Sequence, residues 1–262
     1  MKATVFLGGG RITGALVGGL RLANYAGPLL VYDRHPEKLR QLKKRYRVSV
    51  EPDLAKAIEQ AELAIIAVRP GSVAQLLGRI QSLNRPLCAV SLAAGVPLAE
   101  LRARLGPPVR WTRAMPSPVC RSRRGLTAVV FDRSVPASAR RKIKNLFLQL
   151  GQVVEVPERQ FDAFTVTYSA SHGYHAVSTL AEAARKLGLR RKIAFAAAAH
   201  ALADAISAWR EDDTSLSALL DEARTPGGIA ATVMESMNRA GYRKAVQQGL
   251  AAGVSRARRN RS

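Results

Sequence analysis

Three consecutive glycines stand where an apolar run passes into a helical pattern, within "FLGGGRITGALVGGL" (Phe6 to Leu20). Glycine lets a backbone approach a pyrophosphate closely, and the first turn of a helix presents free N–H groups and the positive end of its dipole. The strict pattern G-x-G-x-x-G fails, because its sixth position is Thr13. We predict a dinucleotide site in this turn; the alternative is a glycine-rich turn that binds nothing. The residues predicted to hold the cofactor here are Gly8, Gly10, Arg11 and Ile12.

The end of the next apolar run bears on which dinucleotide is bound. Asp33 stands where an acidic side chain would bind the adenosine ribose 2′-hydroxyl of NAD. Arg34 follows it, with His35 and Lys38 close by, and these could bind the 2′-phosphate of NADP. Because three basic groups surround one acid, NADP is favoured, and NAD remains the alternative.

The elements that must position these residues fall into two parts. Up to about residue 157, short apolar runs alternate with helical patterns, which indicates a parallel sheet covered by helices on both faces. Residues 158–262 instead carry alanine, leucine and charged residues at helical spacing. The strands are predicted at residues 3–7, 28–33, 62–68, 87–93, 109–114, 126–132 and 152–156, and helices at 36–46 and 71–80.

The predicted fold is therefore an α/β Rossmann-type doubly wound sheet over residues 1–157, followed by an all-α domain over residues 158–262 that ends in a basic tail. The alanine-rich helices of the second domain are apolar on too many sides for a surface helix. Such helices usually bury themselves against another subunit. We therefore expect a homodimer or a higher homo-oligomer through this domain.

The composition limits the class of protein. The formal net charge is +22, yet aromatic residues make up only 5% of the chain and none lies in the basic clusters. This pattern favours a solvated arginine-rich surface over nucleic-acid binding, and a non-catalytic nucleotide-binding or nucleic-acid-associated protein is the alternative. Cys88 and Cys120 lack metal-ligand spacing, so no metal is predicted. Without a membrane-spanning run or a signal-peptide pattern, the sequence predicts a cytoplasmic protein that does not contact a membrane.

Further stretches carry a resemblance to a known family. They are "AVRP" (Ala67 to Pro70), "VSLAAGV" (Val90 to Val96), and "FDAFTVTYSAS" (Phe161 to Ser171) followed later by "TPGG" (Thr225 to Gly228). Together with the glycine turn and the helical second half, they make the chain similar to the pyrroline-5-carboxylate reductase family from about residue 3 to residue 250. The resemblance implies a reductase that passes a hydride from NAD(P)H to the C=N carbon of a cyclic imine carboxylate, with 1-pyrroline-5-carboxylate giving L-proline as the default reaction.

The resemblance also implies roles for particular residues. The Pro-Gly-Gly stretch would be a helix–helix junction in the substrate pocket, with its glycine N–H groups facing the substrate's carboxylate. From the local signal alone, a plain helix break is the alternative. The additional cofactor residues are Val68, Arg69, Pro70, Ala93 and Ala94, and the substrate residues are Ser169, Ser171, Thr225, Gly227, Gly228 and Met115.

Three departures from the family pattern bear on the reaction. The pattern S-G-S-G-P-A-Y reads "SASHGYH" here (Ser169 to His175), and an M-P-N-T-P-like turn reads "MPSPVC" (Met115 to Cys120). The threonine that usually follows Pro-Gly-Gly, proposed to support imine protonation, is replaced by Ala230. These changes favour a different cyclic imine in a specialised pathway as the alternative substrate.

A proton source must replace the missing threonine. We hypothesise that His172 or His175 does so, because histidine titrates near neutrality. Thr225, Tyr174 and water are the other candidates. A histidine without a catalytic role, in the dimer core or on the surface, is the alternative for each of the two.

Overall fold

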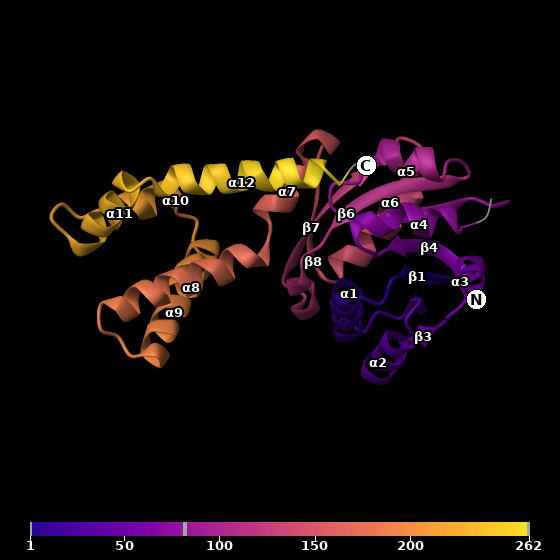
Figure 1. Cartoon of the computed structure of the whole chain (residues 1–262), viewed down its shortest axis with the longest axis horizontal. Coiled ribbons are helices and arrows are strands. Elements are labelled where there is room, and N and C mark those ends of the chain that lie inside the picture. The colour runs from indigo at the N-terminus through magenta and orange to yellow at the C-terminus, as the bar shows by residue number, and fades with distance from the viewer. Residues whose placement is uncertain (1, 81–82, 261–262) are drawn as a thin grey trace. The chain divides into compact units, whose positions relative to one another are not determined.

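The structure is a computed structural model that describes residues 2–80 and 83–260, and it divides into two compact units (Figure 1). The first unit comprises Met1–Tyr168 and Gly253–Ser262, and the second comprises Ser169–Ala252. The predicted boundary at residue 157 falls just before a helix, whereas the compact units divide after Tyr168. The chain therefore enters the second unit from the first and later returns to it.

The first unit is built on one sheet, in which the described strands have the order β3-β2-β1-β4-β5-β6-β7-β8. Every neighbouring pair is parallel except β6 and β7, which are antiparallel. This arrangement confirms the predicted doubly wound sheet. The strands are β1 (Ala3–Leu7), β2 (Leu29–Tyr32), β3 (Ser49–Val50), β4 (Ala61–Ile66), β5 (Leu87–Ser91), β6 (Val109–Met115), β7 (Gly125–Phe131) and β8 (Gly151–Glu155).

Helices cover both faces of this sheet, because the central strands are apolar on both sides. Along β1, Val5 and Leu7 belong to one hydrophobic core and Phe6 to the other. Four helices pack into the first core and three into the second. The first core receives α3 (Leu54–Gln60), α4 (Val73–Gly78), α5 (Leu98–Arg104) and α7 (Glu158–Thr167), and the second receives α1 (Arg11–Leu22), α2 (Pro36–Tyr46) and α6 (Ala137–Leu148).

Helix α2 has the predicted bounds, since Pro36 occupies its first turn and Arg47 ends it in the left-handed conformation. The helix predicted over residues 71–80 forms over a shorter range. Pro70 instead opens a short 3₁₀ turn, η1 (Pro70–Ser72), and α4 begins only at Val73. Ser72, which ends η1 and is the N-cap of α4, has ψ near zero.

The second unit is helical, as predicted. Helices α8 and α9 pack closely through Ala181, Ala194 and Ala198, where small side chains allow the backbones to approach. Large apolar side chains nevertheless stay exposed in the single chain, including Leu187 at 88% and Ile229 at 86%. The helices are α8 (Ala170–Lys186), α9 (Arg191–Glu211), α10 (Leu216–Glu222), α11 (Ile229–Arg239) and α12 (Tyr242–Arg258), the last of which ends in the first unit.

Two kinds of feature are absent from residues 2–80 and 83–260. None of the helices there has both the length and the hydropathy needed to cross a bilayer. In the same residues, no three His, Cys, Asp or Glu side chains come together as a group that could hold a metal ion.

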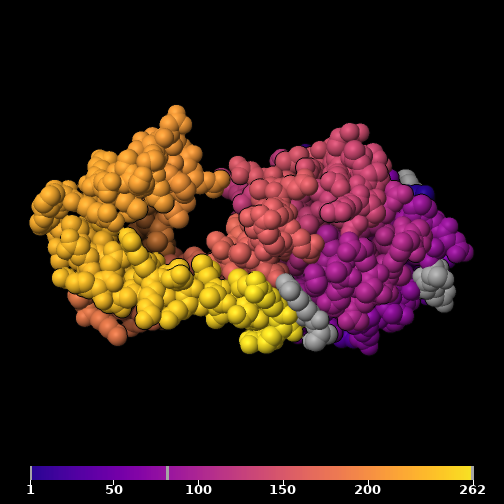
Figure 2. Space-filling model, turned by 90° about the horizontal axis from the view of Figure 1, so that it is seen from above, coloured from indigo at the N-terminus to yellow at the C-terminus, as the bar shows by residue number. Residues whose placement is uncertain are grey.

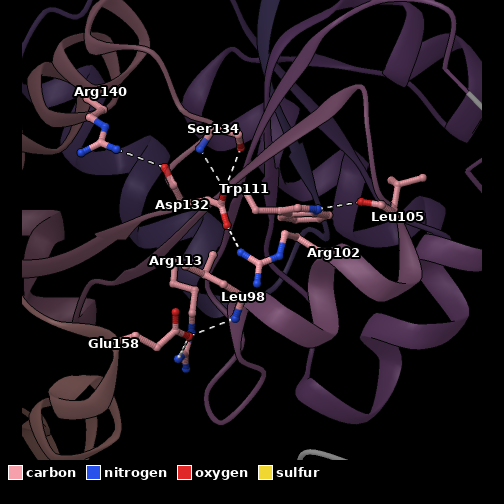
Figure 3. Close-up of polar contacts among 9 residues, drawn as sticks. All are labelled: Leu98, Arg102, Leu105, Trp111, Arg113, Asp132, Ser134, Arg140 and Glu158. Atoms are coloured by element: carbon pink, nitrogen blue, oxygen red, sulfur yellow. Dashed lines mark hydrogen bonds and ion pairs between the residues drawn. The ribbon is translucent and has the colours of Figure 1, made fainter.

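A buried ion cluster joins β6 to α7 (Figure 3). The guanidinium of Arg113, with a side chain only 2% exposed, donates to Glu158 at 2.9 Å and to Asp162 at 3.3 Å. It also lies over the ring of Phe161, 4.2 Å from the centroid. Glu158 additionally accepts a hydrogen bond from the backbone N–H of Leu98 at 2.9 Å, so the cluster ties α7 to the start of α5 as well.

Asp132, just beyond β7, holds a second polar network (Figure 3). Burial disfavours the charged form of its carboxylate. Hydrogen bonds from the backbone and hydroxyl of Ser134 and from the guanidinium of Arg102 outweigh this effect, so the pKa of Asp132 lies below its usual value.

This lowered pKa predicts how the stability of an Asp132→Asn variant depends on pH. A carboxylate whose pKa is lower in the folded state stabilises the protein above its unfolded pKa, and this stability is lost as the pH falls through the folded pKa. We expect the variant to lose about 1–2 kcal/mol of unfolding free energy at pH 7, and the difference from the wild type to shrink on acidification below the unfolded pKa. Urea unfolding at neutral and acidic pH measures this. An equal loss at both pH values would contradict the assignment.

Candidate active site

A cavity of about 1080 Å³ lies in the first unit at the carboxyl ends of β1, β2 and β4. The residues that follow these strands line it: Gly8–Gly10 after β1, Asp33–His35 after β2, and Ala67–Arg69 after β4. Strand β1 lies between β2 and β4, so the strand order reverses at this point. In open α/β sheets, ligands bind at the carboxyl ends of the strands where the order reverses.

The glycine turn has the geometry of an anion-binding site. Gly8 has φ +117°, and a Cβ atom added there would lie 2.7 Å from the backbone oxygen of Ala67, so only glycine fits. Gly10 is the N-cap of α1, has no side chain to cap the helix, and is followed by no acidic residue in the first turn. The first N–H groups of α1 therefore have no partner within the helix and are available to an anion.

Thr13 explains why the turn tolerates the missing third glycine. Its side chain is fully buried, and its hydroxyl donates a hydrogen bond to the backbone oxygen of Gly8. The hydroxyl thus fixes the turn from inside. The sequence pattern gave no indication of this role.

The carboxylate of Asp33 is engaged inside the protein. One oxygen accepts from the backbone N–H of Gly9 at 2.7 Å and from Lys38 Nζ at 3.4 Å, and the other accepts from the N–H of His35 at 2.8 Å. The residue is buried. Asp33 therefore anchors the glycine turn to the end of β2, while Arg34, His35 and Lys38 remain on the rim of the cavity.

The cavity is strongly basic. Of the described residues that line it, seven carry an Arg or Lys side chain and one, Asp33, carries a carboxylate. Such a wall attracts an anionic ligand and raises its local concentration. The seven basic residues are Arg11, Arg34, Lys38, Arg45, Arg69, Arg79 and Arg121.

Most of the predicted cofactor residues come together here. Pro70, Ala93 and Ala94 are not in the lining: Pro70 opens η1, and Ala93 and Ala94 lie in the loop after β5. Sequence reasoning missed Gln41 and Arg45 on α2, although they follow Lys38 at helical spacing, which is the signal that could have found them. The predicted residues that line the cavity are Gly8, Gly10, Arg11, Ile12, Asp33, Arg34, Lys38, Val68 and Arg69.

The turn after β6 also reaches the cavity. Met115, a predicted substrate residue, is half-buried at the end of β6, and Ser117 caps the 3₁₀ turn η2 (Pro118–Ser122) by accepting from the N–H of Val119. This turn places Pro118 and Arg121 in the cavity lining. Burial raises the pKa of the Cys120 thiol in the same turn to about 12, so it is uncharged at neutral pH.

The other predicted substrate residues belong to the second unit. Ser169 caps α8 by accepting from the N–H of Ser171, and the two hydroxyl oxygens lie 2.7 Å apart. His172, Tyr174 and His175 follow on the first turns of α8, and all three are exposed in the single chain. The start of α8 therefore presents two serine hydroxyls, the phenol of Tyr174 and two imidazoles.

The Pro-Gly-Gly stretch forms the connection between α10 and α11. The N–H of Gly228 donates to the oxygen of Thr225 at 2.8 Å, and Gly227 has φ +73°, which closes a tight turn. Gly228 is then the N-cap of α11 without a side-chain cap. The hydroxyl of Thr232 donates to the oxygen of Gly228 at 3.0 Å, so it bonds within the first turn of α11.

A doubly wound sheet, a glycine turn at a helix N-terminus and a basic cavity at the switch point define a Rossmann-type dinucleotide-binding protein. Residues 158–260 match the family "Pyrroline-5-carboxylate reductase dimerisation", and residues 4–95 match "NADP oxidoreductase coenzyme F420-dependent". Over nearly its whole length the chain is similar to pyrroline-5-carboxylate reductases, in agreement with the resemblance seen in the sequence.

Individual relatives are similar over nearly their whole length. The pyrroline-5-carboxylate reductase of Mycobacterium tuberculosis (strain ATCC 25618 / H37Rv) is 28% identical, covering 98% of this chain and 96% of that protein. The enzyme of that name from Escherichia coli (strain K12) is 27% identical, covering 95% and 94%. The crystal structure of Plasmodium falciparum pyrroline carboxylate reductase with NADP bound superposes with a TM-score of 0.89 at 20% identity, covering 100% of this chain and 98% of that chain.

Proposed function

We propose that this protein is a cytoplasmic, NADPH-dependent reductase that transfers a hydride to the C=N bond of 1-pyrroline-5-carboxylate and gives L-proline. The observation that carries the proposal is the basic cavity at the glycine turn, in a chain similar to pyrroline-5-carboxylate reductases from end to end. A reduced nicotinamide dinucleotide supplies the hydride when it is bound.

The chain's own residues bind and orient the reactants. The N-terminus of α1 binds the pyrophosphate, and Arg34, His35 and Lys38 bind the 2′-phosphate. Val68 and Arg69 line the wall of the same cavity. The turn Thr225–Gly228 offers glycine N–H groups and the start of α11 to the substrate's carboxylate.

The helical unit supports a homodimer. The match to a dimerisation family covers it, and its exposed apolar side chains include Tyr174 at 72% and Ile229 at 86%. A second copy that buries this surface would also cover the starts of α8 and α11. The substrate would then be enclosed by residues that are exposed in the single chain.

The proton donor is proposed to be His172 or His175. Alanine substitution of the one that protonates the imine nitrogen is expected to lower kcat/KM by about five- to tenfold, less than the full value of general acid catalysis, because water and Thr225 remain as donors. The control is His200→Ala, an exposed histidine on α9 that pairs with Asp204. Full kcat/KM in both variants would remove the histidines from the mechanism.

A different cyclic imine is the second candidate substrate. Ala230 and the segment Ser169–His175 depart from the family pattern in the region proposed to hold the substrate. NADPH oxidation, followed by absorbance with 1-pyrroline-5-carboxylate and a panel of cyclic imines with and without a carboxylate, tests both candidates. The proposed function requires turnover of 1-pyrroline-5-carboxylate. Turnover of another imine alone would favour the second candidate, and salt-sensitive DNA binding without any turnover would overturn both.

The cofactor preference gives a prediction of its own. Arg34→Ala is expected to weaken NADPH binding by roughly tenfold and to leave NADH binding unchanged, because the side chain would contact only the 2′-phosphate. Titration of the intrinsic NAD(P)H fluorescence measures both dissociation constants. Lys44→Ala, an exposed cation on α2 outside the cavity, should change neither. An equal loss for both coenzymes would contradict the assignment.

A further inference from the structure

The end of α12 belongs to the first unit and packs there against α7, labelled in Figure 1, and against the loop after β5. A Cβ atom added at Gly253 would lie 3.1 Å from Cγ1 of Val166, so α12 passes directly over α7. Ala257, further along the helix, is buried. In Figure 2 this part of the chain, in yellow, lies against the surface of the first unit.

The second segment is the loop after β5. Gly95 has φ +79°, and a Cβ atom added there would lie 2.0 Å from the backbone oxygen of Ala257, so the two backbones touch. Beyond the helix, Nδ2 of Asn260 donates to the backbone oxygen of Ala94 at 3.3 Å. Residues at and just beyond the end of α12 therefore hold the conformation of this loop, although Ala94 and Asn260 are 166 positions apart in the chain.

This loop lies at the same edge of the sheet as the cavity. Strand β5 pairs with β4, with Ser91 opposite Ile66, and the N–H of Leu92 donates to the oxygen of Ile66 at 3.0 Å. The residues after β4 already line the cavity. In a doubly wound sheet the dinucleotide crosses the switch point, with its two halves on opposite sides of the first strand. The basic residues after β2 mark the adenosine side, so the loop after β5 lies on the nicotinamide side.

We propose that Asn260 is a positioning residue for the dinucleotide: the end of α12 holds the Ala94–Gly95 loop in the conformation that receives the nicotinamide half. This inference rests on the proposed cofactor binding. A positioning role differs from a purely structural role in the ligands whose binding it affects. Loss of the contact should affect ligands that reach the nicotinamide side and spare ligands that end before it.

The test is Asn260→Asp, which removes the donor to Ala94 without changing the size of the side chain. Asn145→Asp, at an exposed position on α6, is the matched control. Hydrogen exchange of the peptide covering residues 92–97, measured without cofactor, should accelerate in the variant and not in the control. The Kd for NADPH should rise about three- to tenfold, as expected for the loss of one hydrogen bond. The Kd for 2′-phospho-ADP-ribose, which lacks nicotinamide, should not change.

Two results would overturn the inference. One is unchanged exchange together with an unchanged Kd for NADPH; the other is equal weakening of NADPH and of 2′-phospho-ADP-ribose. Gly95→Ala serves as a second variant that disturbs the contact from the loop side, and it should give the same selective loss. If the wild type binds neither ligand, the proposed function itself fails. If the wild type binds both ligands and the variant binds them equally well, only the inference about Asn260 fails.

Discussion

Replacement of Gly10 by alanine is expected to raise the Kd for NADPH by about 10- to 100-fold while leaving the thermal unfolding midpoint unchanged. A Cβ atom at Gly10 meets no other atom within 4 Å, and φ is −80°, so the empty protein accommodates alanine. The methyl group would instead stand where the pyrophosphate approaches the start of α1. Loss of one hydrogen bond to a charged group costs about 1.5–3 kcal/mol, which corresponds to the stated change in Kd.

Two other glycines provide the comparison. Gly8→Ala should lower the unfolding midpoint as well, because its φ of +117° and the backbone of Ala67 exclude a side chain even without ligand. Gly78 lies on α4, where an added Cβ atom meets no other atom within 4 Å. Gly78→Ala should therefore leave NADPH binding unchanged and should not lower the unfolding midpoint. Fluorescence titration with NADPH and thermal unfolding monitored by circular dichroism separate the three cases. If Gly10→Ala bound NADPH as tightly as the wild type, the glycine turn would not be the pyrophosphate site.

The second large effect is expected at Arg113. Arg113→Ala should reduce the free energy of unfolding by about 3–5 kcal/mol, because it leaves the carboxylates of Glu158 and Asp162 without their buried cation. It also removes the contact with the ring of Phe161. Arg113→Lys keeps the charge but cannot reach both carboxylates with a planar fork, so an intermediate loss is expected.

Urea unfolding measures these losses. Trp111 is buried on the same strand and reports on this region, and a Trp209→Phe background removes the fluorescence of the other tryptophan, on α9. Arg159→Ala is the control, since Arg159 lies on α7 but is exposed. A loss below about 1 kcal/mol for Arg113→Ala, in the range of surface ion pairs, would show that the cluster does not stabilise the junction of β6 and α7.

Much of the fold was predictable because the strongest patterns are local. The apolar run Ala3–Leu7 and the proline at the start of α2 mark elements that the structure reproduces without a shift. Strand β3 (Ser49–Val50) carries no such pattern, since it is two residues long and pairs only at the edge of the sheet. The predicted helix began two residues too early because Gly71 and Ser72 directly precede the apolar residues at helical spacing, Val73, Leu76 and Leu77, all of which lie in α4.

The candidate site was predictable only in part, for a related reason. The glycine turn and Asp33 follow their strands directly, so the sequence places them together. Arg79, the C-cap of α4, and Arg121 in η2 reach the same cavity, and only the folded sheet brings these segments side by side. The engagement of Asp33 by the N–H of Gly9 could not be foreseen either, because it depends on the distance between the ends of β1 and β2.

The neighbouring positions of Val166 and Gly253 have a consequence for the architecture of the chain. Residues 169–252 leave the nucleotide-binding sheet and rejoin it at adjacent points, so they constitute an insert rather than an appendage. Inserts whose two ends lie together can be exchanged with little strain on the host. A short flexible linker in their place should leave a free-standing coenzyme-binding module, and the same junction offers a site at which a foreign assembly module could be grafted.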